Sequence, residues 1–208
     1  MTIQDYQVAI ATIPVKIPEQ EVENQAEYNY FWKNGVEETS KHKGHIVLSI
    51  MNSGKNPVQE NLLFSKIASS VMNNSKSIGI YIGGRTLVLK KDFYQANVEM
   101  MSETDLPLYN WIYFGLREEN GKNSVYTYGL ANFNKMEMEI IESNVSIEEL
   151  NEMMFNLAHY VISYDVADTK DGPMTSSLQQ PLLLTSARLS RIKRRHPRQL
   201  KSSPRLSW

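Results

Sequence analysis

The chain has 208 residues, of which 41% are hydrophobic and 22% are charged, and its formal net charge is -1. That value hides a division: 14 basic and 23 acidic residues give residues 1–171 a charge of -9, whereas eight basic and no acidic residues give residues 172–208 a charge of +8. The lack of cysteine excludes disulfides, thiol nucleophiles and Cys-ligated metal sites. Since no apolar run approaches the ~20 residues that cross a bilayer, and residues 1–18 lack the pattern of a signal peptide, we expect a cytoplasmic protein.

The first part of the chain predicts a strand followed by a helix. Residues 6–13 are rich in β-branched side chains and read as a strand. A helix is expected over residues 25–41, because Tyr28, Trp32 and Val36 recur at intervals of four.

Clear signals follow along the rest of the acidic part. Asn56 before Pro57 is a typical helix start, Asn120-Gly121 is a typical hairpin turn, and Ser146 is the first residue of a capping box. The patterns predict, in order, a strand over 45–51, a helix over 57–72, a hairpin of 77–82 and 86–89, a helix over 92–101, a hairpin of 109–116 and 124–130, a strand over 137–142 and a helix after residue 146.

This order predicts the α+β class, with helices packed on a mixed, mostly antiparallel sheet. A doubly wound parallel sheet is the second choice. We expect one domain over residues 1–172. Residues 173–208 combine unbalanced basic charge with three prolines between positions 173 and 197, which predicts a disordered tail.

Three polar residues are the strongest candidates for a catalytic centre. His45 follows His42 by three positions, but a metal site there needs a third ligand. Arg85 follows Gly83-Gly84, which resembles an anion-binding nest and equally fits a plain hairpin turn. His159 falls opposite the apolar stripe of the last helix. No motif assigns these residues a catalytic role, and we predict neither a cofactor nor a metal.

Aromatic residues are dense in the predicted hairpin of 109–116 and 124–130. On the predicted strands two faces form, the first with Tyr109, Trp111 and Tyr113 and the second with Tyr126 and Tyr128. Either these rings pack under a helix, or they form an exposed recognition surface for a protein.

Several segments together resemble a bacterial family known as domain of unknown function 4261. The resemblance runs from about residue 6 to 172, and it is carried by residues 42–51, 79–84 (GIYIGG), 93–94, 106–116 (LPLYNWIYFGL), 126–130 (YTYGL), 133, 137–139 and 155–161 (FNLAHYV). The family implies no established activity, so no residue inherits a role from it. The chain departs from the family pattern by lacking a first strand–helix segment and by its basic ending, which suggests a shifted reading frame or a fusion.

The leading hypothesis is therefore a non-enzymatic interaction or accessory protein with an unidentified protein partner. One alternative is a hydrolase or transferase with His45, Arg85 or His159 as its polar centre. The other is nucleic-acid binding through the basic tail, since a body of charge -9 repels phosphates. The sequence leaves the oligomeric state open.

Overall fold

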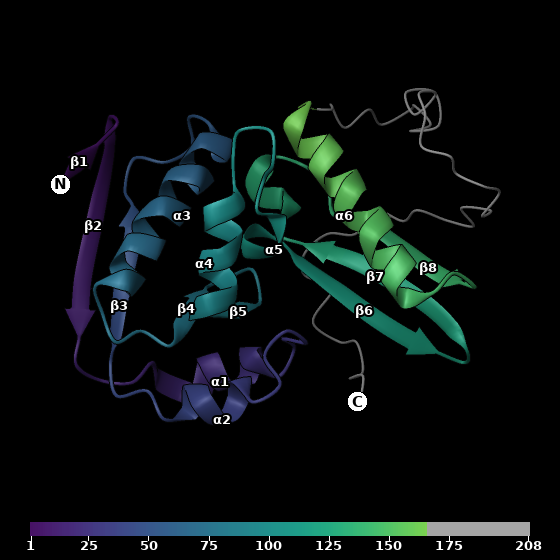
Figure 1. Cartoon of the computed structure of the whole chain (residues 1–208), viewed down its shortest axis with the longest axis horizontal. Helices are drawn as coiled ribbons and strands as arrows, with labels where there is room; N and C mark the ends of the chain where they lie inside the picture. The colour runs from purple at the N-terminus through teal and green to yellow at the C-terminus, as the bar shows by residue number, and fades with distance from the viewer. Residues whose placement is uncertain (166–208) are drawn as a thin grey trace. The chain divides into compact units, whose positions relative to one another are not determined.

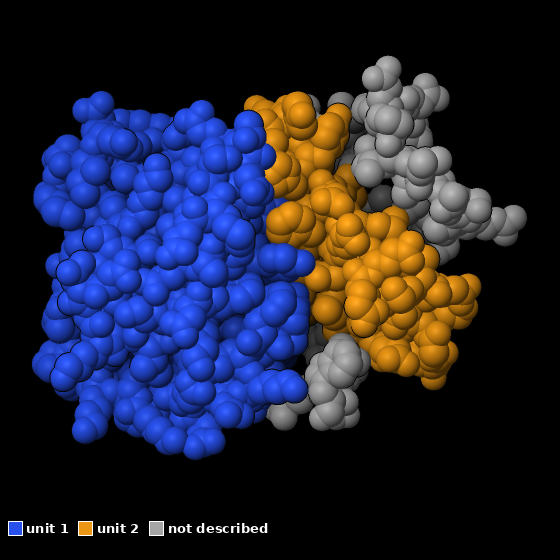
Figure 2. Space-filling view, viewed as in Figure 1, with its two compact units in different colours: residues 1–113 blue, residues 114–208 orange. Residues whose placement is uncertain are grey.

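The computed structural model describes residues 1–165. Contacts divide the chain into two compact units, Met1–Tyr113 and Phe114–Trp208 (Figure 2). The single domain expected over residues 1–172 stays a prediction, and the tail predicted over residues 173–208 lies outside the described residues.

In residues 1–165 the strands form three separate sheets, ordered β1-β2-β3, β4-β5 and β6-β7-β8 (Figure 1). The predicted α+β class is therefore confirmed. The elements of unit 1 are β1 (Thr2–Ile3), β2 (Tyr6–Ile13), a 3-10 turn η1 (Pro18–Gln20), α1 (Glu21–Ala26), α2 (Gly35–Ser40), β3 (His45–Ile50), α3 (Pro57–Asn73), β4 (Gly79–Ile82), β5 (Leu87–Lys90), α4 (Lys91–Met100) and α5 (Leu108–Trp111).

The long helix α3 joins the first two sheets. It begins where predicted, with the Asn56 side chain accepting a hydrogen bond from the Gln59 backbone N–H at 3.1 Å. Leu63 and Ile67 pack with Val8 of β2, which pairs antiparallel with β3. One face of α3 therefore covers the first sheet.

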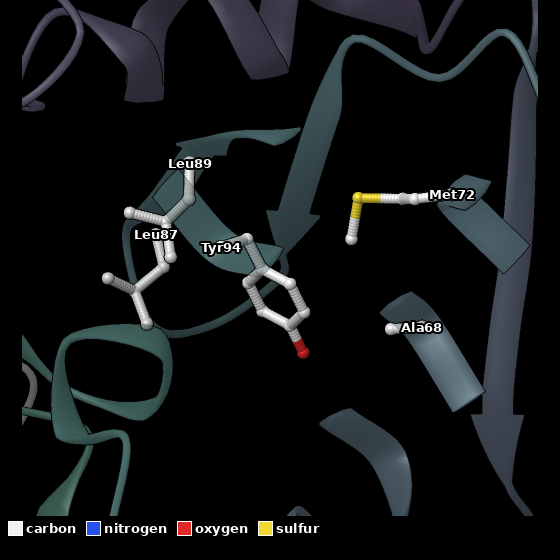
Figure 3. Close-up of a cluster of buried hydrophobic side chains, with 5 residues drawn as sticks. All are labelled: Ala68, Met72, Leu87, Leu89 and Tyr94. Atoms are coloured by element: carbon white, nitrogen blue, oxygen red, sulfur yellow. The ribbon is translucent and has the colours of Figure 1, made fainter. Parts of the chain in front are cut away.

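Strand β5 of the β4–β5 hairpin is buried on both of its faces. Leu87 and Leu89 pack with Ala68 and Met72 of α3 and with Tyr94 of α4 (Figure 3). The opposite face is covered by Val22 and Ala26 of α1 and by Trp32, which pack with Val88 of the hairpin. Alternate residues of β5 thus serve two cores, which explains its continuous apolar sequence.

The helix predicted over residues 25–41 is wrong. The structure has two short helices, α1 and α2, separated by a non-helical stretch over residues 27–34. Trp32 is buried in that stretch, whereas Tyr28 and Val36 are exposed. The interval of four between these residues therefore reflects a tertiary contact of the tryptophan and not one face of a helix.

The strand predicted over residues 109–116 is also wrong at its start. Residues Leu108–Trp111 form the helical turn α5, and the strand begins at Tyr113. Leu108 and Trp111 are both fully buried, and a helical turn is the conformation that brings residues three apart to the same side.

Unit 2 is a three-stranded sheet with one long helix. Its elements are β6 (Tyr113–Glu119), β7 (Lys122–Tyr128), a 3-10 turn η2 (Leu130–Phe133), β8 (Glu139–Ser143) and α6 (Ile147–Ser163). Asn120 and Gly121 both have positive φ, as the predicted hairpin turn requires. Helix α6 begins at the predicted cap, where Ser146 Oγ accepts a hydrogen bond from the Glu149 N–H at 3.2 Å, and Leu150 and Met154 on it are buried.

A buried carboxylate organises the end of β7. Glu137 is 3% exposed. Its Oε1 accepts from the N–H groups of Gly129 (2.8 Å) and Ala131 (3.2 Å), and its Oε2 accepts from the Thr127 hydroxyl (2.9 Å). Three donors therefore satisfy this charge and hold the η2 turn in place.

Within residues 1–165, no helix combines the length and the apolar character that a membrane crossing needs.

Replacing Glu137 by Gln should destabilise the protein by about 1–3 kcal/mol. The amide NH2 would face the Thr127 hydroxyl, which now donates to a carboxylate, and the two backbone N–H bonds would lose the acceptor's charge. Urea unfolding of the full chain measures this change. Glu152→Gln on the exposed side of α6 is the matched control and should change stability by less than about 0.5 kcal/mol. Equal effects of the two substitutions would show that the three hydrogen bonds do not stabilise the fold.

Tyr94 should make the protein sensitive to alkali. Burial raises its pKa to about 12, while the nearby Ser65 hydroxyl and Arg85 partly oppose this rise. The unfolded tyrosine ionises near pH 10, so its contribution to the free energy of unfolding is complete below about pH 10 and is lost between about pH 10 and 12.

Urea unfolding between about pH 8 and 12 tests this expectation. Tyr94→Phe should reduce the loss of stability above about pH 10, and Tyr164→Phe, at an exposed tyrosine, should leave it as in the wild type. The same pH dependence in Tyr94→Phe and the wild type would refute this account of Tyr94.

Candidate functional site

Four aromatic residues of unit 1 are grouped together, and one of them, Phe31, is exposed. Phe31 stacks on Phe93 with ring centroids 4.6 Å apart, and its ring lies 5.3 Å from Tyr109 and 4.3 Å from Tyr30. Phe31 is nevertheless 43% exposed. These four residues are called the aromatic cluster below.

The backbone that carries Phe31 is held on both sides. The side-chain amide of Asn29 donates a hydrogen bond to the Val88 carbonyl of β5, and its Oδ1 accepts from the Phe31 N–H at 2.8 Å. The next residue, Trp32, is 4% exposed. The exposed ring therefore lies between two anchored residues.

Two glycines leave room for the Trp32 indole. A Cβ added at Gly79 would lie 2.8 Å from Cζ3 of the indole, and one added at Gly35 would lie 3.3 Å from its Cγ. The ring packs with Val22 and Ala26 of α1. Because the indole N–H has no hydrogen-bond partner among residues 1–165, packing is what we expect to hold it.

Helices α4 and α5 present the other two rings. Tyr109 lies between buried Leu108 and buried Asn110 on the short α5. The Asn110 side chain donates to the Tyr94 carbonyl at 2.9 Å and accepts from the Asn97 amide at 3.2 Å, both in α4. These bonds tie α5 to the helix that carries Phe93.

The deepest hydroxyl of the cluster stays protonated at neutral pH. Burial raises the pKa of Tyr30, and the neighbouring Tyr109 hydroxyl raises it further. The cluster thus offers aromatic faces and a neutral phenol, which suit adhesion and hydrogen bonding.

The chain around these rings is acidic. Residues 18–34 and 90–109 together contain eight acidic residues and three lysines. Two of the lysines are engaged: Lys90 Nζ lies 3.5 Å from Glu38 Oε2, and Lys91 Nζ donates to the Met72 carbonyl at 2.7 Å. The third, Lys33, is exposed.

The structure regroups the aromatic residues that the sequence singled out. The prediction that Tyr109, Trp111 and Tyr113 share a strand face is wrong, because α5 replaces that strand. Trp111 is 1% exposed and donates from Nε1 to Ser65 Oγ at 2.9 Å, while the Tyr113 hydroxyl donates to the Tyr28 carbonyl at 3.3 Å. Only Tyr109 of these three joins the aromatic cluster.

The other two predicted aromatics, Tyr126 and Tyr128, lie in unit 2. Both are half-buried and two positions apart on β7, so they share a face of that strand. A Cβ at Gly115 would overlap the Tyr126 ring, so the glycine of β6 lets this ring lie flat on the sheet. The proposal that these residues form a recognition surface stays a prediction.

Phe31 and Phe93 were missed as site residues. Residues 27–34 were expected to be helical, which placed Phe31 beside a buried stripe. The sequence did contain a signal in the run Tyr28-Asn-Tyr-Phe-Trp32, which ends three positions before Gly35. Four of its five residues are aromatic, and one buried face of a helix cannot hold all of them.

Two of the predicted catalytic candidates, His45 and Arg85, lie in unit 1. His45 Nδ1 lies 2.9 Å from the Val15 carbonyl. Arg85 donates to Asn61 Oδ1 at 2.9 Å and to the Trp111 carbonyl at 3.3 Å. These contacts tie His45 and Arg85 to different segments of unit 1.

His159 belongs to unit 2. On α6 its Nδ1 lies 3.4 Å from Ser163 Oγ, and its ring stacks near Phe155. Within the described part of the chain, no three or more His, Asp or Glu residues are grouped so that they could hold a metal ion.

Comparison with known proteins finds one family. Residues 126–172 match the family model described as domain of unknown function, DUF4261. The resemblance inferred from the sequence is confirmed over this range. No curated protein and no solved structure matches the chain.

Gly79→Ala should loosen the anchor of the aromatic cluster. The added methyl group meets both the Leu89 carbonyl oxygen and the indole of Trp32, so we expect a loss of about 1–3 kcal/mol in the free energy of unfolding. A red-shifted tryptophan emission would report the part of this effect that falls on Trp32. Gly83→Ala is the matched control, since a Cβ there meets only the Tyr81 hydroxyl, at 3.9 Å. If Gly79→Ala is as stable as Gly83→Ala, Trp32 is not held by this close approach.

Proposed function

We propose that this chain is a non-enzymatic, cytoplasmic protein-interaction module and that the aromatic cluster is its binding surface. The observation that carries the proposal is the exposure of Phe31, a residue that remains 43% exposed although its ring lies against three other aromatic rings.

The chemistry of the cluster supports this role. Aromatic side chains are enriched in protein interfaces because they cover a large area with few rotatable bonds. Tyr30 and Tyr109 add hydroxyl groups at the same place, so a partner would meet both apolar and polar contacts.

The anchoring of residues 27–34 supports it further. A flexible loop loses conformational freedom on binding, whereas one that is already held loses little. The Asn29 hydrogen bonds and the burial of Trp32 hold Phe31 before any partner arrives.

Photo-cross-linking in living cells tests the proposal. A photoreactive phenylalanine analogue is placed in the full chain at Phe31 or at Val47, a matched control on β3 that is also 43% exposed. We expect a discrete covalent adduct with one protein from position 31 and not from position 47. The adduct is identified by mass spectrometry, and the identified protein is then purified.

Binding of the purified partner to the full chain gives the quantitative result. Phe31→Ala should raise the Kd by about 30-fold, which corresponds to ~2 kcal/mol for a central interface residue. Val47→Ala should change it by less than about threefold. Equal adducts from the two positions, or a partner whose affinity is indifferent to Phe31→Ala, would refute the proposal.

A further inference from the structure

The chain segments that carry the aromatic cluster have several exposed acidic residues. Of the eight in residues 18–34 and 90–109, only Glu23 is buried. The other seven are exposed, namely Glu19, Glu21, Glu27, Asp92, Glu99, Glu103 and Asp105. Acidic residues outnumber lysines eight to three on these segments. Of the lysines, Lys90 pairs with Glu38 and lies over the Trp32 ring, and Lys91 donates to the Met72 carbonyl.

Acidic residues also directly adjoin the cluster in the chain. Asp92 precedes Phe93, and Glu27 lies four positions before Phe31 in sequence. Negative charge and exposed aromatic faces therefore occur together on the same segments.

From this combination we infer that the segment bound by the aromatic cluster is cationic and presents arginine side chains. The inference rests on the proposed function and names the chemistry of the partner. A guanidinium group is attracted to the negative face of an aromatic ring, and its N–H donors match the geometry of a carboxylate.

Arginine suits this surface better than lysine does. Its planar group is weakly hydrated, so it can stack on Phe31 at a smaller loss of hydration. An acidic protein or a nucleic acid would meet repulsion from the same carboxylates, because both carry negative charge.

Fluorescence anisotropy with labelled peptides tests the inference on the full chain. The probe is a short repeat of arginine, serine and glycine, and three matched peptides replace arginine by lysine, by the neutral isostere citrulline, or by leucine. A second form of the protein has the eight basic residues of 172–208 changed to Gln, so that its own cationic segment does not compete with the probe.

We expect the arginine peptide to bind more tightly than the lysine peptide, and the citrulline peptide to lose at least about tenfold in affinity. Raising salt from about 50 to 200 mM should weaken binding. Phe31→Ala should cost about tenfold, and Val47→Ala should have no effect.

A charge-matched pair of variants separates local from general attraction. Asp92→Asn with Glu99→Gln removes two charges from α4, and Glu148→Gln with Glu152→Gln removes two from α6. Only the first pair should weaken the arginine peptide, by about threefold or more.

Equal binding of the arginine and citrulline peptides, equal effects of the two charge pairs, or no peptide binding at all would each overturn the inference. Preferential binding of the leucine peptide would overturn it as well. None of these outcomes affects the cross-linking result at Phe31, so the proposed function stands or fails by itself.

Discussion

The close packing of Trp32 against Gly79 is the contact on which the candidate site depends. The indole reaches the β4–β5 hairpin because both Gly79 and Gly35 leave room for it. Trp32 is held there, and Asn29 is bonded to Val88. Few backbone conformations can therefore connect these two residues. Phe31, between these anchors, is therefore kept at the surface although the next residue, Trp32, is buried.

The same hairpin organises the rest of unit 1. One face of the hairpin packs on α3 and α4, and the other face packs on α1. Three helices are therefore in contact with two strands of four residues each. Buried polar bonds then set the position of α5, where Asn110 and Trp111 bond to α4 and α3. A rigid frame of this kind can display an aromatic surface without a large entropic loss on binding.

Local signals proved reliable where the interaction is itself local. The Asn56 and Ser146 caps and the Asn120-Gly121 turn satisfy backbone groups within a few residues, so sequence patterns predict them. The predicted helix over 25–41 failed because Trp32 gains more by packing against Gly79, 47 positions away in the chain, than by continuing a helix. Likewise, α5 replaced a strand because Leu108 and Trp111 both find buried positions.

By itself the sequence determined the α+β class, most of the elements, the acidic character of residues 1–171 and the family resemblance over residues 126–172. Periodicity and charge are properties of the chain and can be read without coordinates. Only the tertiary structure decided which aromatic residues are buried and which are exposed. Trp111 and Trp32 lie inside while Phe31 lies outside, because that choice depends on glycines and polar groups contributed by distant segments.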